Sequence, residues 1–160
     1  HRVLLLHAGG ESRRLPCYVP EGKLFAPLAL QSPSAFPPVV LDVLLSLYFR
    51  YPWVAGEAIV ASGDVIVDFD TAALHGSFER GDICGFGTAV SLEQGSRHGV
   101  FGSDPAACAA TDDGPRSTTM PVSDFFQKAL VTTLRQKALL PPAAAGERCA
   151  VDTGIFSMTA

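Results

Sequence analysis

The sequence predicts an α/β layer fold whose sheet is largely parallel. Short apolar runs that fit buried strands alternate along the chain with segments whose apolar residues recur at helical spacing. The 160 residues, of which 48% are hydrophobic, suffice for one domain with a buried core. Only 18% of the residues are charged, so the composition also excludes a disordered chain.

The first half of the chain carries two strand signals and one helix signal. Residues 2–7 form a short apolar run that ends at glycines, which is typical of a buried strand. A helix is expected over residues 39–51, since two prolines precede it and Pro52 ends it. Its apolar residues share one face at spacings of three and four: Val40, Val43, Leu44, Leu47 and Tyr48. Residues 57–61 are expected to form the next strand.

The second half of the chain is expected to alternate in the same way. Residues 104–121 are rich in Ala, Asp, Gly, Ser and Thr and are expected to form a surface loop or an insertion, and residues 141–147 an Ala/Pro linker. The other signals are a strand at 83–90, a strand or turn at 99–102, an extended stretch at 122–126, a helix at 129–140, and a last strand at 149–151 that resumes at 155–158 after a turn.

Charge and cysteine content narrow the possible functions. The net charge is -4, so a general nucleic-acid binder is excluded, because that function needs a basic face. No apolar run approaches the roughly 18 residues of a bilayer span, so no membrane association is expected. Cys17, Cys84, Cys108 and Cys149 lie far apart without zinc-site spacing, which favours reduced thiols and a cytoplasmic location.

The strongest chemical signal is the loop after the first strand, where residues 7–16 are HAGGESRRLP. At Gly9 and Gly10 backbone amides can approach a ligand without a side chain in the way. Two arginines, the second of which is Arg14, and then Lys23 follow, a set of cations that suits a polyphosphate. A glycine turn with solvated arginines is the alternative interpretation.

The second signal is Asp64, which ends the run Ala-Ser-Gly-Asp after a predicted strand. Ligands of parallel sheets bind beyond the carboxyl ends of the strands, where a carboxylate can hold Mg²⁺. An aspartate at a strand end is also a common turn or cap residue. The cationic loop favours the metal hypothesis, since phosphates, a hard cation and a carboxylate belong to one chemistry.

Three weaker signals follow along the chain. Gly99, in the run Arg-His-Gly-Val-Phe, would allow a ligand to approach the backbone closely. Gln127 and Lys128 form a polar pair at the end of an extended stretch, and Asp152 stands at a predicted strand end before a turn. Each of these residues also has an ordinary interpretation as a loop or turn residue.

In order, these motifs resemble those of the sugar-1-phosphate nucleotidyltransferases, and most of all the fucose-1-phosphate guanylyltransferase module of bifunctional fucokinase/GDP-fucose pyrophosphorylases. The resemblance runs from about residue 2 to 158 and is carried by residues 6–16, Tyr18, Pro20, Gly22-Lys23, 61–65 and 98–101. It implies a Rossmann-like, GT-A-like fold with a mixed, mostly parallel sheet and flanking helices. It also implies one nucleotidyltransferase domain over residues 1–160, an incomplete module of a chain that continues at both ends.

The resemblance implies a nucleotide site in the first loop. Gly9 and Gly10 match glycines whose amides meet the nucleotide, and Ser12 stands where the family has another close-approach glycine. Arg14 matches the arginine that binds the triphosphate. Lys23 matches the lysine that steadies the phosphates in the transition state, so Arg14 and Lys23 are the implied catalytic residues.

The resemblance also implies a metal ligand and a sugar-phosphate site. Asp64 matches the carboxylate that holds the catalytic Mg²⁺, and no match to the family's second metal ligand is found before Ala160. Gly99 matches a backbone contact to the sugar, Lys128 a basic residue near the sugar phosphate, and Asp152 a residue that reads a sugar hydroxyl.

The implied reaction is nucleotidyl transfer from GTP to L-fucose 1-phosphate, or to a related sugar such as D-arabinose 1-phosphate. Its catalysis rests on positioning and charge neutralisation, and a fused sugar kinase domain is the implied partner. Two alternatives stay open. One is a nucleotidyltransferase that uses another base or sugar, and the other is a non-catalytic module that serves as a binding or interface domain.

Overall fold

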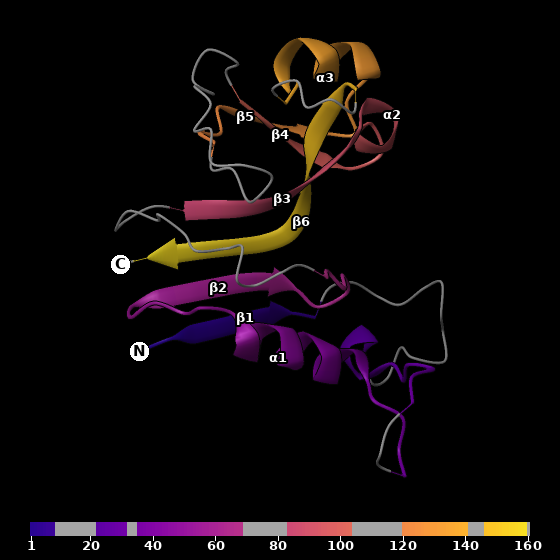
Figure 1. The fold of residues 1–160 in the computed structure, drawn as a ribbon, viewed down its shortest axis with the longest axis vertical. Helices are drawn as coiled ribbons and strands as arrows, with labels where there is room; N and C mark the ends of the chain where they lie inside the picture. The colour runs from indigo at the N-terminus through magenta and orange to yellow at the C-terminus, as the bar shows by residue number, and fades with distance from the viewer. Residues whose placement is uncertain (9–21, 32–34, 69–82, 104–119, 141–145, 160) are drawn as a thin grey trace. The chain divides into compact units, whose positions relative to one another are not determined.

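The computed structural model describes residues 1–8, 22–31, 35–68, 83–103, 120–140 and 146–159. The chain divides into two compact units. Unit 1 consists of His1–Cys84 and Gly154–Ala160, and unit 2 consists of Gly85–Thr153. The last strand, β6 (Arg148–Thr159), begins in unit 2 and ends in unit 1, so it contributes to both (Figure 1).

Unit 1 contains the first two strands and the end of the last one. β1 (Val3–His7) pairs in parallel with β2 (Glu57–Ser62), so the carboxyl ends of both strands lie at one edge. β2 also pairs antiparallel with the last residues of β6. The two strands that the apolar runs predicted in this half of the chain are confirmed. The expected burial of the first was wrong, because β1 is an edge strand whose Val3 and Leu5 are about half exposed.

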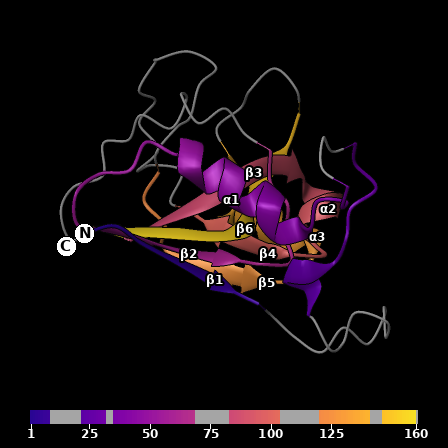
Figure 2. The same ribbon diagram turned by 90° about the horizontal axis from the view of Figure 1, so that it is seen from below.

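The helix α1 (Val40–Arg50) runs along one side of β1 and β2 (Figures 1 and 2). At its start the carboxylate of Asp42 accepts a hydrogen bond of 2.8 Å from the backbone N–H of Val39, which the helix itself leaves without a partner. Leu44 and Tyr48 are buried and form the inward face of the helix. The predicted helix is confirmed to within one residue at either end.

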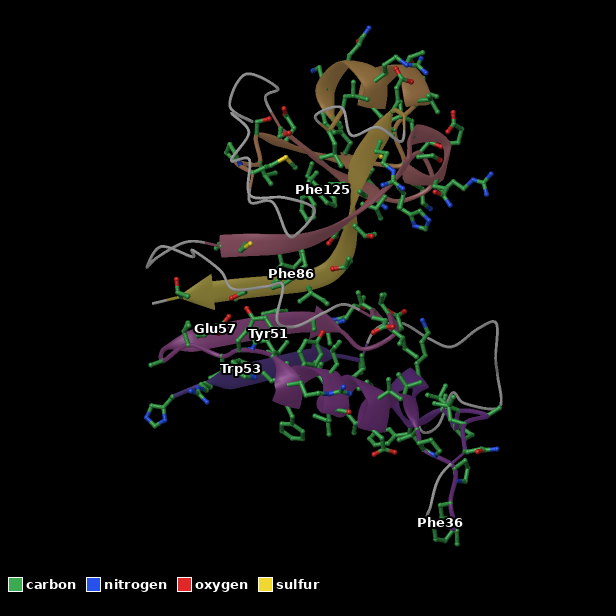
Figure 3. The ribbon with its side chains drawn as sticks, viewed as in Figure 1. Phe36, Tyr51, Trp53, Glu57, Phe86 and Phe125 are labelled. Atoms are coloured by element: carbon green, nitrogen blue, oxygen red, sulfur yellow. The ribbon has the colours of Figure 1, made fainter. Side chains whose placement is uncertain are left out.

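A buried polar cluster joins the end of α1 to β2 and β6. Glu57 is 1% exposed, and its Oε1 accepts hydrogen bonds from the hydroxyls of Tyr51, at 2.9 Å, and Ser157, at 2.6 Å. Its Oε2 accepts a bond of 2.9 Å from the backbone N–H of Val54. Figure 3 shows Tyr51 and Glu57 beside Trp53, whose ring meets that of Tyr51 edge-on. These three donors allow the carboxylate to be buried, which would otherwise be costly.

Unit 2 contains most of β3 (Ile83–Ser91), then β4 (Gly99–Gly102), β5 (Asp124–Gln127) and the first part of β6. β4 pairs antiparallel with both β5 and β6, and β3 pairs with β6. The helices of this unit are α2 (Leu92–Gly95) and α3 (Val131–Lys137). Its core is apolar and contains Leu92, Val100, Leu134, Ala138, Cys149 and Val151.

The elements of unit 2 follow the expected order, with one addition. The expected strand or turn at 99–102 is a strand, and the expected extended stretch and helix form β5 and a shorter α3. α2 was not predicted. It is a single turn capped by reciprocal bonds of 3.3 Å between Ser91 and Gln94, and the sequence Ser-Leu-Glu-Gln carries this capping-box signal.

The α/β class with a mixed sheet is confirmed, but the expectation of mostly parallel pairing was wrong beyond β1 and β2. The pairs β2–β6, β4–β6 and β4–β5 are all antiparallel. An alternation of strand and helix signals does not set strand direction, because a helix yields a parallel pair only when it returns the chain to the starting edge. The finer Rossmann-like, GT-A-like description stays a prediction.

The second correction concerns the last strand. β6 is continuous from Arg148 to Thr159, so Asp152 lies within a strand and not at a strand end before a turn. Gly154 has a φ of +71°, in the left-handed region that glycine tolerates. The Asp-Thr-Gly run therefore resembles a turn in sequence, although its residues stay in the ladder. The side chain of Thr153 donates a hydrogen bond of 2.8 Å to the carbonyl of Phe86 in β3.

Several expectations lie outside the described residues. They include nearly all of the loop expected at 104–121 and most of the linker expected at 141–147. Within the described part of the chain, no helix is long and apolar enough to cross a membrane.

Candidate functional site

The carboxyl edge of the parallel pair in unit 1 forms the first part of the candidate site. His7, the last residue of β1, is the register partner of Ser62, the last residue of β2. The N–H of Gly63 donates a hydrogen bond of 2.8 Å to the carbonyl of His7, which extends the pairing by one step. The glycine-arginine loop and Asp64 therefore start from the same edge of the sheet, where parallel strands present ligand-binding residues.

Gly63 brings the segment around Lys23 against this edge. Gly63 is buried, and a Cβ atom there would lie 2.7 Å from Cδ2 of Leu24 and 3.1 Å from the carbonyl oxygen of His7. Glycine is thus the residue that lets Leu24 pack on the end of β2. Leu24 belongs to the short helix η2 (Lys23–Phe25). Its packing on Gly63 therefore holds the backbone of η2, and with it Lys23, close to Asp64.

Lys23 and Asp64, which are 41 positions apart in the chain, form an ion pair. The Nζ atom of Lys23 lies 2.5 Å from Oδ2 of Asp64, and the hydroxyl of Ser62 donates a bond of 2.6 Å to Oδ1. The hydrogen bond from Lys23 is the main cause that lowers the pKa of Asp64, and the bond from Ser62 comes second. The two side chains are 38% and 32% exposed, so a ligand from solvent can reach both.

In unit 2 the ends of β4 and β5 bring together two motifs that are far apart in sequence. Gly99 is the register partner of Gln127 in the antiparallel pair. The N–H of Lys128 donates a hydrogen bond of 2.9 Å to the carbonyl of His98, so Lys128 is held beside the start of β4. Lys128 has a φ of 50°, which is uncommon for a residue with a side chain and is found mostly where the surroundings enforce it.

The packing around Gly99 gives this glycine a structural reason as well. A Cβ atom at Gly99 would lie 2.6 Å from Cζ of Phe125 and 3.2 Å from Oε1 of Gln127. The ring of Phe125 also meets that of Phe101 at 5.6 Å between centroids. The group that lies close to the backbone of Gly99 is therefore the ring of Phe125. The contact of Gly99 to a sugar stays a prediction.

The other predicted residues are placed as follows. Gly9, Gly10, Ser12 and Arg14 lie outside the described residues. Asp152 lies in the part of β6 that belongs to unit 2.

Comparison with known proteins gives the family. The fucose pyrophosphorylase domain model matches residues 1–160. This chain belongs to the fucose pyrophosphorylase domain family. The family predicted from the sequence motifs is thereby confirmed, and the motifs that predicted it include the residues that meet at the edge of unit 1.

Curated relatives of this fucose pyrophosphorylase domain include two bifunctional proteins. It is 34% identical to the L-fucokinase/L-fucose-1-P guanylyltransferase of Bacteroides fragilis, over 63% of this chain and 11% of that protein. It is 32% identical to the bifunctional fucokinase/GDP-fucose pyrophosphorylase of Arabidopsis thaliana, over 97% of this chain and 14% of that protein. The human fucose-1-phosphate guanylyltransferase is 36% identical over 64% of this chain and 17% of its own length. The chain thus spans less than a fifth of each of these relatives.

The residues at the edge of unit 1 of the fucose pyrophosphorylase domain fit a magnesium ion. The ligand is the carboxylate of Asp64, a hard oxygen donor of the kind that Mg²⁺ prefers, and the hydroxyl of Ser62 orients it through Oδ1. Oδ2 of Asp64 already binds a cation, the ammonium group of Lys23. No group of three or more His, Cys, Asp or Glu side chains among the described residues is arranged to hold a metal. Mg²⁺ is often bound by one or two carboxylates together with waters and substrate phosphates.

Sequence reasoning missed the contribution of Ser62 to this site. Its hydroxyl contacts Asp64 directly, although no role for Ser62 followed from the motif. The available signal was a hydroxyl residue two positions before a strand-end aspartate, a spacing at which local side-chain hydrogen bonds are common.

Proposed function

We propose that this domain takes part in nucleotidyl transfer from GTP to L-fucose 1-phosphate, which yields GDP-fucose and pyrophosphate. The observation that carries the proposal is the meeting of Lys23 and Asp64 at the carboxyl edge of β1 and β2, where the glycine-arginine loop begins. The choice of sugar and base is supported by the names of the relatives, which include fucose-1-phosphate guanylyltransferases. A Rossmann-like, GT-A-like fold is part of the same proposal.

The proposed reaction needs positive charge more than it needs a nucleophilic side chain. A phosphate oxygen of the sugar 1-phosphate bonds to the α-phosphorus of the triphosphate. The bond from that phosphorus to the bridging oxygen breaks, and the electron pair leaves with pyrophosphate. The attacking oxygen is already anionic, so the protein has to orient it and offset the charge of the phosphates.

Two basic side chains and a metal ion would supply that charge. Arg14 and Lys23 would bind the triphosphate, and Asp64 would hold Mg²⁺, which when bound offsets phosphate charge and orients the phosphate oxygens. The carboxylate of Asp64, whose pKa lies below the ordinary value of 3.8, is ionised at neutral pH, the form that a metal requires.

Unit 2 would bind the sugar phosphate through Gly99, Lys128 and Asp152. The support is that the first two lie together at the ends of β4 and β5, although 29 positions separate them in sequence. A sugar kinase on the same chain, as in the two bifunctional relatives, is the proposed source of the sugar 1-phosphate.

Pyrophosphate release from the full-length protein tests the proposal. We expect release with GTP and L-fucose 1-phosphate, much less with UTP, and none after the divalent cations are removed by EDTA. D-arabinose 1-phosphate in place of fucose 1-phosphate tests the related sugar. If no pair of nucleotide and sugar phosphate gives pyrophosphate while GTP still binds, the domain is a binding module and not a transferase.

A further inference from the structure

We propose that Ser62 and Lys23 act in opposite directions on Asp64, an inference that rests on the proposed function. Ser62 holds the carboxylate in the orientation that receives a divalent cation. Lys23 occupies the cation-binding oxygen until a nucleotide draws the lysine away. Ser62 is thus a positioning residue of the metal site, and Lys23 is an exchangeable partner of Asp64.

The two oxygens of Asp64 are bound by donors of different kinds. Oδ1 accepts the hydroxyl of Ser62 at 2.6 Å, and Oδ2 contacts the ammonium group of Lys23. Ser62 ends β2 and pairs with His7 in the ladder, and its side chain has one rotatable bond to the hydroxyl oxygen. Lys23 reaches Asp64 through a flexible four-carbon stem that is 38% exposed. The bond from Ser62 is therefore the fixed one, and the bond from Lys23 can be exchanged.

The backbone below Lys23 is held in place while its side chain can move. The next residue, Leu24, is buried and packs within 2.7 Å of the position that a Cβ atom of Gly63 would take. Exchange of the Lys23 side chain therefore does not require η2 to move. The ammonium group then has two possible partners, the carboxylate of Asp64 and the phosphates of a nucleotide that approaches the same edge.

Electrostatics makes the two partners of Oδ2 compete. An ammonium group and a divalent cation repel each other, so each weakens the binding of the other at one carboxylate oxygen. A triphosphate carries more negative charge than Asp64, so it attracts Lys23 away and leaves Oδ2 to the cation. Nucleotide and metal would in this way favour the binding of each other.

Mn²⁺ binding to the full-length protein without nucleotide tests the inference independently of activity, with the affinity measured by titration calorimetry or by the electron paramagnetic resonance of free Mn²⁺. Ser62→Ala should weaken Mn²⁺ binding about tenfold, the lower end for loss of a group that orients a metal ligand. Ser62→Thr, which keeps the hydroxyl, should restore the affinity. Lys23→Met should tighten Mn²⁺ binding by about two- to fivefold, the scale of an exposed ion pair.

Matched controls separate these effects from general ones. Ser96→Ala removes a hydroxyl that bonds only the carbonyl of Glu93 in the described contacts, and Lys137→Met removes an exposed positive charge from unit 2. Neither should change the Mn²⁺ affinity. In EDTA, Lys23→Met should weaken GTP binding, because the same ammonium group is expected to bind the phosphates.

The outcomes distinguish this inference from the proposed function. If Asp64→Asn abolishes Mn²⁺ binding but Ser62→Ala does not change it, or Lys23→Met weakens it, the inference is overturned and the metal site stands. If Asp64→Asn leaves Mn²⁺ binding unchanged, or the wild-type protein binds no Mn²⁺ either with or without GTP, the metal site itself is wrong and both proposals are overturned. If Ser62→Ala does not fold, the pair Ser62→Thr and Ser62→Val tests the same hydroxyl.

Discussion

The two units of this domain hold their candidate residues by different means. In unit 1 a side-chain ion pair joins Lys23 to Asp64 at the ends of parallel strands. In unit 2 a backbone hydrogen bond from Lys128 to His98 holds the candidate lysine beside antiparallel strands. The residues of unit 1 should therefore respond to changes of charge, whereas those of unit 2 should respond to changes of backbone conformation.

The interiors of the two units also differ, because unit 1 contains a buried polar cluster and the core cluster of unit 2 is apolar. Unit 1 buries the carboxylate of Glu57 with the hydroxyls of Tyr51 and Ser157, whereas the core cluster of unit 2 is apolar, as at Leu134 and Val100. Buried polar clusters are sensitive to the loss of one member, because each remaining group loses a partner. Substitutions in the two interiors should thus have separable effects.

The largest expected effect is that of Glu57→Ala on unit 1. The substitution removes the acceptor of two hydroxyls and one backbone N–H, and we expect the free energy of unfolding to fall by about 3 kcal/mol or more. Glu57→Gln, which keeps an acceptor, should cost less. Amide hydrogen exchange should show lost protection in α1 and β2, with α3 unchanged. Equal loss in α3 would show that the two units unfold together.

Lys23→Ala should lower turnover in the full-length protein by at least about a hundredfold, the scale for loss of one preorganised donor to the transition state. The reason is that Lys23 forms an ion pair with Asp64 at the edge of the sheet where the triphosphate is proposed to bind. Lys137→Ala in unit 2 is the matched control and should leave turnover unchanged. Near-normal turnover of the Lys23 variant would remove it from the catalytic residues.

Alkaline pH should destabilise unit 1 through its two buried tyrosines. Burial raises the pKa of Tyr48 from 10.0 to about 12, and burial followed by Glu57 raises that of Tyr51 further. A raised pKa gives stability that is complete below pH 10 and is lost as the pH rises toward the folded value, at about 1.4 kcal/mol per pH unit for each tyrosine. Residues 85–153, which make up unit 2, contain no tyrosine. The alkaline loss of unit 2 comes instead from the buried thiol of Cys149, whose pKa is raised by burial and then by Glu93.

Denaturant unfolding between pH 9 and 11 measures this dependence, and Tyr48→Phe is the test variant. We expect a shallower alkaline slope for the variant than for the wild type, since one titrating group with a raised pKa is gone. An unchanged slope would mean that Tyr48 keeps an ordinary pKa in the folded protein.

Local signals in the sequence were sufficient for most elements of the fold, although α2 was missed. The apolar run at β1, the helical spacing at α1 and the small residues along β3 each marked one element of the fold. Strand direction and the continuity of β6 depend on pairing between distant segments, which no local pattern encodes. The left-handed Gly154 within β6 is the clearest case, because a turn and a strand with one left-handed glycine share the same residues.

The candidate site was predicted residue by residue, but its contacts were not. The motifs singled out Lys23 and Asp64, yet their ion pair depends on the packing of Leu24 on Gly63, a tertiary contact. The role of Ser62 was missed although its signal is local. Its hydrogen bond to Asp64 forms because β2 ends at Ser62 and the chain then turns.

The smallest expected effect is at Lys128, and it tests whether the candidate residues of unit 2 depend on backbone conformation. A residue with a side chain at a φ of 50° is less stable there than glycine by about 1 kcal/mol. Lys128→Gly and Lys128→Ala both remove the ammonium group, so the difference between them isolates the conformation. We expect Lys128→Gly to unfold at a free energy about 1 kcal/mol higher than Lys128→Ala. If the ammonium group binds the sugar phosphate, both variants should raise its Michaelis constant alike. If the glycine variant instead keeps the wild-type constant and only the alanine variant loses affinity, Lys128 serves the site through its left-handed backbone, and its charge is not used.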